Sequence, residues 1–102
     1  MTPEELAATI TLVCGETVKF EYSVCTKRGV ATSTWKMYQS YLRGGRKEWT
    51  TCQVCFAHGP SKAAAMEMMV GEALKWADQL NASRERMRKY REKMQARSRV
   101  TK

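Results

Sequence analysis

Four cysteines are the residues of this chain with the clearest capacity for chemistry. Cys52 and Cys55 form a Cys-x-x-Cys pair, the spacing with which two thiolates hold one tetrahedral zinc ion. Cys14 would supply a third ligand, and Cys25 or His58 would supply the fourth. The alternative is a strand that places one cysteine in the core and one on the opposite face. A redox role is disfavoured, because the pair lies late in a predicted strand and not at a helix N-terminus.

No other pattern in the sequence predicts catalysis. His58 is the only histidine, and it falls in a predicted turn, where a lone histidine is more often structural than catalytic. The sequence contains no nucleophile elbow, no phosphate-binding glycine loop and no pair of catalytic carboxylates. We therefore expect a protein without enzymatic activity.

Positive charge is concentrated in the last twenty residues, 83–102. This segment holds nine basic and two acidic residues, a net of +7 out of +8 for the whole chain, whereas residues 1–82 have nine basic and eight acidic residues. A charge of this density is stable only beside a polyanion or an acidic partner surface, or in bulk water. The sequence therefore predicts a compact domain over 1–82 followed by a basic helical tail over 83–102.

Basic side chains of the tail and of the predicted loops are the candidate ligands for nucleic acid. Lysine and arginine neutralise phosphates and release counterions, and the aromatic residues Trp35, Tyr38, Tyr41 and Trp49 could stack on unpaired bases. At least two of the three tryptophans are nevertheless expected in the core. The candidate binding residues are Lys27, Arg28, Arg43, Arg46, Lys47, Lys62, Arg84, Arg86, Arg88, Lys89, Arg91 and Lys93.

Local signals predict the elements that position these residues. Thr2, Pro3 and Glu5 are typical of a capped helix start, and Gly15 is typical of its end, although the β-favouring run 9–13 leaves a strand open for the second half. Alternating apolar residues predict strands over 17–25, 34–42 and 48–56. A basic loop is expected over 26–33 and a glycine turn over 43–46.

A long helix is predicted after Ser61, because apolar residues recur at helical spacing from 62 to about 80. Gly71 inside it is interpreted as a point of close approach to the sheet. The tail either continues this helix or begins a second one at Ser83. The Met87, Tyr90 and Met94 stripe could dock on a partner protein or pair the long helix with a second copy in a homodimer.

These elements define an α+β fold: a three-stranded antiparallel sheet packed against a long C-terminal helix, with a short N-terminal helix and a basic helical tail. No apolar run approaches the roughly 20 residues needed to span a bilayer, so no membrane partner is expected. The N-terminal residues lack the features of a signal peptide. A cytoplasmic location follows as an expectation, in which the cysteines are thiols or metal ligands.

The cysteine region also resembles a known family. Three stretches carry the likeness: 12–15 (Leu-Val-Cys-Gly), 49–60, which includes the Cys-x-x-Cys pair, and 72–76 (Glu-Ala-Leu-Lys-Trp). They resemble small zinc-ribbon restriction-alleviation proteins of phages and prophages, with Thr11 where one knuckle cysteine would stand. The resemblance implies a phage protein that modulates host restriction enzymes without catalysis. The candidate zinc ligands of this chain remain Cys14, Cys25, Cys52 and Cys55, with His58 as the alternative to Cys25.

A second resemblance lies in the order of elements, α-β-β-β-α over about residues 3–80. Residues 59–65 (Gly-Pro-Ser-Lys-Ala-Ala-Ala) look like the start of the last helix in double-stranded-RNA-binding domains. In those domains a lysine cluster at this position contacts phosphates across the major groove, and Lys62 is the matching residue here. This resemblance implies binding to the backbone of an RNA duplex.

The function expected from the sequence is non-enzymatic nucleic-acid binding, in which the tail and the hairpin loops contact DNA or RNA phosphates. The alternative is a phage-type anti-restriction or anti-defence protein that binds a host nucleic-acid-processing enzyme and modulates it. No cofactor is expected beyond zinc.

Overall fold

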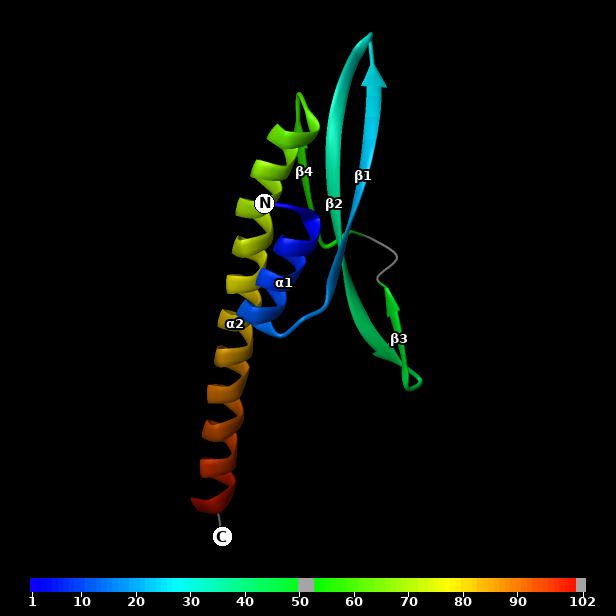
Figure 1. Ribbon diagram of the computed structural model, residues 1–102. Coiled ribbons are helices and arrows are strands. Elements are labelled where there is room, and N and C mark those ends of the chain that lie inside the picture. Colours follow the sequence, from blue (N-terminus) through cyan, green and yellow to red (C-terminus); the bar gives the residue numbers. More distant parts are fainter. Residues whose placement is uncertain (50–52, 101–102) are drawn as a thin grey trace.

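A computed structural model of the chain describes residues 1–49 and 53–100. It has a short N-terminal helix, an antiparallel sheet and a long C-terminal helix, so the predicted α+β fold is confirmed (Figure 1). The elements are α1 (Pro3–Cys14), β1 (Val18–Lys27), β2 (Val30–Arg43), β3 (Arg46–Trp49), β4 (Cys55–Gly59) and α2 (Lys62–Val100).

The sheet is organised around β2. This strand pairs with β1 through residues 30–39, with β4 through residues 33–37 and with β3 through residues 40–43, in each case antiparallel. Because β1 and β4 both pair with residues 33–37, they lie on opposite edges of β2. Both helices cover the same face of the sheet (Figure 1).

The core lies between this covered face and the two helices. Leu6 and Ile10 of α1, Met37 of β2 and Met69 of α2 are fully buried. Each sits at the spacing of its element's inward face, every third or fourth residue in the helices and every second in the strands. Burying side chains of this size contributes about 1.5–3 kcal/mol each, so this layer fixes the helices on the sheet.

The N-terminal helix begins and ends as its sequence predicts. The Thr2 hydroxyl accepts a hydrogen bond from the Glu5 amide at 3.1 Å, and the Glu5 carboxylate accepts one from the Thr2 amide at 3.4 Å. Gly15 ends the helix with a φ of 75°, and its amide donates to the Thr11 carbonyl. The run 9–13 is helical throughout, so the strand alternative for it is wrong.

The basic loop predicted over 26–33 is wrong, because β1 and β2 extend until two residues separate them. Arg28 and Gly29 have φ angles of 53° and 77°, the left-handed values that allow a two-residue hairpin turn to match the twist of the strands. The predicted glycine turn between β2 and β3 is confirmed, with φ angles of 57° at Gly44 and 83° at Gly45.

The third strand, predicted over 48–56, is wrong as one element, because β3 ends at Trp49 and β4 begins at Cys55. The register explains the interruption. Trp49 pairs with Ser40 and Cys55 pairs with Met37. Between these two pairs the chain has five residues (50–54), whereas β2 has only two (38–39). A continuous ladder needs equal numbers. Residues 50–52, including Cys52, lie outside the described part of the chain.

The long helix runs unbroken from Lys62 to Val100. Ser61 caps it as predicted, since its hydroxyl accepts from the Ala64 amide at 3.2 Å. At about 1.5 Å per residue, its 39 residues extend for about 58 Å, and the half beyond Asn81 projects past the body (Figure 1). The predicted boundary between 82 and 83 therefore falls inside a continuous helix.

The close approach expected at Gly71 occurs instead at Gly59. A Cβ built on Gly71 has no neighbour within 4 Å, whereas one on Gly59 would lie 2.6 Å from the Ala65 amide nitrogen. Of the three tryptophans, Trp35 is buried, Trp76 is half-buried and Trp49 is 39% exposed. The expectation of two buried tryptophans is therefore wrong. Within the described residues, no helix is long and apolar enough to cross a membrane.

Candidate nucleic-acid interface

The tail forms a cationic rod beyond the folded body. Every residue from 85 to 98 is exposed. Arg86, Lys89, Lys93 and Arg97 follow one another at intervals of three and four, so they share one face of α2. We call these four residues the basic stripe. At about 1.5 Å per residue it extends for about 17 Å, with its charges arranged along a line that a phosphate backbone could follow.

Arg88, another predicted ligand, is occupied by acids of its own helix. Its guanidinium pairs with Glu85 and, at 3.2 Å, with Glu92. The hydrogen bond from Arg88 lowers the pKa of Glu85, and the same bond raises the pKa of Arg88. Exposed pairs of this kind add little stability, but they neutralise Arg88 locally. Arg88 is therefore a weaker candidate for a phosphate contact.

Arg84 belongs to the folded body rather than to a phosphate site. Its guanidinium donates to the Cys14 carbonyl and forms an ion pair with Glu16. One turn earlier, the Asn81 amide donates to the Val13 carbonyl at 2.8 Å. These carbonyls are among those that the end of a helix leaves without intrahelical partners, and a cation there also meets the negative end of the helix dipole. Arg84 thus joins α2 to the end of α1.

Replacing Arg84 by Met should lower the free energy of unfolding by about 1 kcal/mol, because the charged hydrogen bonds are lost while the aliphatic stem is kept. Urea unfolding followed by circular dichroism would measure this change. The matched control is Arg91→Met, two turns further along the tail, which we expect to leave stability unchanged. Equal unfolding midpoints for the two variants would show that Arg84 does not fasten α2 to α1.

Five further predicted ligands lie at the two hairpins of the sheet. Lys27 and Arg28 occupy the tip of the β1–β2 hairpin, while Arg43, Arg46 and Lys47 lie at the β2–β3 hairpin. The 13 residue steps of β2 between Val30 and Arg43 extend for about 44 Å. In Figure 1 the β2–β3 hairpin and the tail point toward the same end of the molecule, and the β1–β2 tip points the other way. The two hairpins therefore lie at opposite ends of β2.

Lys62, the residue matched to double-stranded-RNA-binding domains, lies over aromatic rings of the sheet. Its ammonium is 4.8 Å from the centre of the Tyr22 ring and 5.6 Å from that of Trp35. Cation–π contacts of this geometry contribute about 0.5–1 kcal/mol at exposed sites. Lys62 remains exposed, so the contact orients the side chain without burying its charge.

The uncovered side of the sheet joins Tyr38 and Trp49, two of the predicted stacking rings, to residues that were not predicted to bind nucleic acid. Cross-strand pairing and the alternation of β2 bring together Lys19, Lys36, Tyr38, Trp49, Phe56 and His58, here called the open sheet face. In the described residues no helix covers it. The sequence predicts Phe56 as the end of a strand, and His58 as a turn residue or a zinc ligand. Their alternation with Cys55 and Ala57 indicates that they point to one face of the sheet, but it does not show which face the helices cover.

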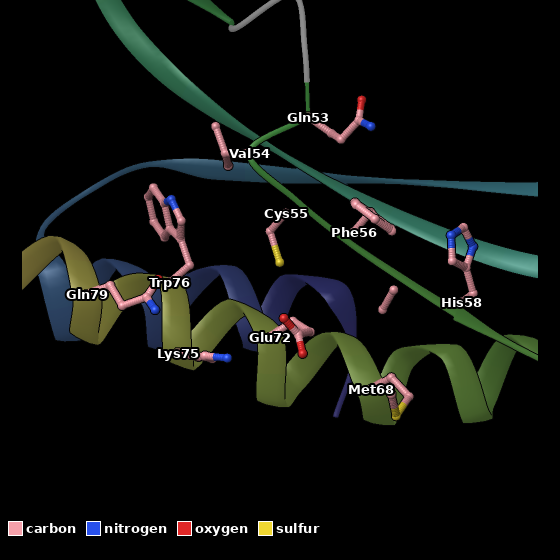
Figure 2. A pocket seen from close by; sticks show the side chains of 11 residues that line it. Gln53, Val54, Cys55, Phe56, His58, Met68, Glu72, Lys75, Trp76 and Gln79 are labelled. Atoms are coloured by element: carbon pink, nitrogen blue, oxygen red, sulfur yellow. The ribbon is translucent and has the colours of Figure 1, made fainter.

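A groove of about 620 Å³ runs between β4 and α2. Figure 2 shows its two walls, with Phe56 and His58 on β4 and Met68, Glu72 and Trp76 on α2. Cys55 points from β4 toward α2, where its thiol donates to the Met69 sulfur at 3.9 Å. Burial and, second, the charge of Glu72 raise the pKa of Cys55 from 9.0 to about 11, so the thiol is protonated at neutral pH.

The predicted zinc ligands are not brought together in the part of the chain that is described. Cys25 pairs with Thr32 and Cys55 with Met37, five positions apart on β2, or about 17 Å. Cys14 is buried in α1, where its thiol donates to the Ile10 carbonyl. No group of three or more potential ligands occurs among the described residues. Cys52, the fourth predicted ligand, lies outside the described residues.

Thiol reactivity should separate these cysteines. We expect exposed Cys25 to be alkylated faster than Cys55 at pH 8, and the rate at Cys55 to keep rising until about pH 11. The pKa of Cys55 is higher in the folded than in the unfolded state, so protonation of the thiol favours folding. This contribution to the free energy of unfolding is present below pH 9 and is lost between pH 9 and 11. Timed alkylation with peptide mass spectrometry measures both rates, with the urea-unfolded chain as control. A Cys55 rate that levels off below pH 9 would contradict this environment.

The fold and the site together define a small α+β protein with a projecting cationic helix and an open aromatic sheet face. Comparisons with protein families, with curated proteins and with solved structures gave no match. The assignment of function therefore depends on the chemistry of the surface.

Proposed function

We propose that this protein is a non-enzymatic nucleic-acid-binding protein whose helical tail contacts backbone phosphates. The observation that carries the proposal is the basic stripe, four cations in line on an exposed helical face. A regular row of cations neutralises successive phosphates and gains affinity from counterion release. Contacts of this type place a protein on the backbone without reading the base sequence.

The nearby hairpin supports the same proposal. Arg46 and Lys47 of β3 lie toward the end of the molecule from which the tail projects (Figure 1). They would add a second group of phosphate contacts toward the same end of the molecule as the basic stripe. Lys27 and Arg28, at the opposite tip, are left out of the proposed interface.

A second candidate function is docking on a host nucleic-acid-processing protein, as the resemblance to restriction-alleviation proteins implies. The observation that favours it is the apolar stripe of the tail, where Met87, Tyr90 and Met94 are 49%, 59% and 45% exposed. An amphipathic helix of this kind can enter an apolar groove of a partner. Met87→Ala with Tyr90→Ala would then weaken function more than removal of charge.

The test of the leading proposal is the salt dependence of binding. Fluorescence anisotropy with a labelled 20-base-pair DNA should show affinity falling about 100-fold between 50 and 200 mM salt, as about four neutralised phosphates require. Weak binding that does not change with salt would remove backbone phosphates as the target. A parallel pull-down with and without nuclease separates a nucleic-acid ligand from a protein partner.

A further inference from the structure

Four aromatic side chains on the open sheet face are arranged in a ladder. In antiparallel pairing, directly opposed residues share a face, and β2 alternates so that Ser40, Tyr38, Lys36 and Thr34 point the same way. Ser40 pairs with Trp49, Lys36 with Phe56 and Thr34 with His58. Trp49, Tyr38, Phe56 and His58 therefore occupy four successive rows, about 7 Å apart.

The rings are accessible and two of them are held in place. Phe56 is 52% exposed and Trp49 is 39% exposed. The ring centres of Phe56 and His58 lie 5.1 Å apart, and the His58 ring nitrogen Nδ1 is 2.8 Å from the Thr34 hydroxyl oxygen. An exposed aromatic row of this kind is costly to leave in water unless it meets a flat apolar ligand.

Lysines are interleaved with the rings. The Lys19 ammonium lies 5.6 Å from the centre of the Tyr38 ring and 5.0 Å from that of Trp49, between two successive rows. Lys36 stands directly opposite Phe56. Glu21 is the acid in these rows, and its carboxylate forms an exposed ion pair with the Lys19 ammonium at 3.6 Å. Two lysines against one acid leave the face with a net positive charge. A cation between two rings lies where the phosphate linking two stacked bases would pass.

We propose that the open sheet face binds a single-stranded nucleic acid, with bases stacked on Trp49, Tyr38 and Phe56 and the linking phosphates on Lys19 and Lys36. Every base has an aromatic face, so stacking is sequence-tolerant and worth about 1–3 kcal/mol per base. A base paired within a duplex cannot reach these rings. The inference depends on the proposed nucleic-acid function and names its substrate class, a single strand.

The test compares three labelled probes of equal length: an oligothymidine, an abasic strand and a DNA duplex. Wild type should bind oligothymidine at least about tenfold tighter than the abasic strand, the amount that about 1.4 kcal/mol of stacking provides. Trp49→Ala with Phe56→Ala should lose most of this preference, since only Tyr38 of the three stacking rings remains. It should keep its duplex affinity, because the duplex contacts the tail.

Two further variants make the result decisive. Tyr41→Ala removes an aromatic ring of similar exposure from the covered side of the same hairpin and should behave as wild type. Trp49→Phe with Phe56→Tyr keeps both rings and should retain the preference for oligothymidine, which excludes misfolding as the cause of any loss. Equal binding of oligothymidine and abasic strand by wild type would overturn the inference and leave the tail proposal standing. Failure to bind any probe would reject the proposed function itself.

Discussion

Neutralising the basic stripe should weaken DNA binding on the order of 100-fold at low salt. The variant replaces all four residues, as Arg86→Gln, Lys89→Gln, Lys93→Gln and Arg97→Gln. Each lost phosphate contact lowers the magnitude of the slope of log affinity against log salt by about 0.9. The expected reduction in slope is therefore about 3.6. Glutamine retains helix propensity, so circular dichroism should show the same helical content. Anisotropy titrations at several salt concentrations give both quantities.

A matched pair distinguishes this effect from that of net charge. Two double variants have the same net charge. One is Arg86→Gln with Lys93→Gln, and the other is Lys27→Gln with Lys75→Gln. The first pair lies on the basic stripe, and the second lies at the far hairpin tip and beside the β4–α2 groove. We expect the first pair to lower the salt slope by about 2 and the second to leave it unchanged. Equal losses would mean that binding responds to total charge and not to a site.

Adding a single methyl group at Gly59 should destabilise the protein by about 3 kcal/mol. The Cβ of Gly59→Ala would lie 2.6 Å from the Ala65 amide nitrogen and 2.9 Å from its Cα. Both are backbone atoms of the first turn of α2, so a side-chain rotation cannot relieve the contact, and overpacking of this kind typically costs 1–3 kcal/mol. Urea unfolding followed by circular dichroism would measure the loss.

Gly71→Ala is the control for that substitution, and its effect should have the opposite sign. A Cβ at Gly71 meets no atom within 4 Å, and alanine is favoured over glycine inside a helix by about 1 kcal/mol. Stability should therefore rise by about that amount. If both variants were stabilised, β4 and the start of α2 would not approach each other as closely as described.

Features encoded by neighbouring residues could be predicted from the sequence. The capping box of Thr2 and Glu5, the helix end at Gly15 and the turn at Gly44 and Gly45 each depend on a few adjacent residues. The long helix was predictable for the same reason. The sequence does not decide whether this helix continues into the tail, because Ser83 is both a tolerable helix residue and a good N-cap.

Features that depend on distant residues could not be predicted. The interruption between β3 and β4 is set by the register of β2, and the role of Arg84 depends on a carbonyl 70 residues earlier. Recognising the open sheet face required knowing that both helices cover one side. The place of Phe56 and His58 on this face could therefore not be predicted, whereas the cations of the tail follow from composition alone.

The most direct test of the account is a chain that ends at Arg88, one turn beyond Arg84. It keeps the contacts of Asn81 and Arg84 with α1 and removes six basic residues and one acidic residue of the tail. The account predicts an unchanged urea midpoint together with loss of salt-dependent DNA binding. A shortened chain that folds and binds duplex DNA as tightly as the full chain would contradict the claim that the cationic helix is the binding element.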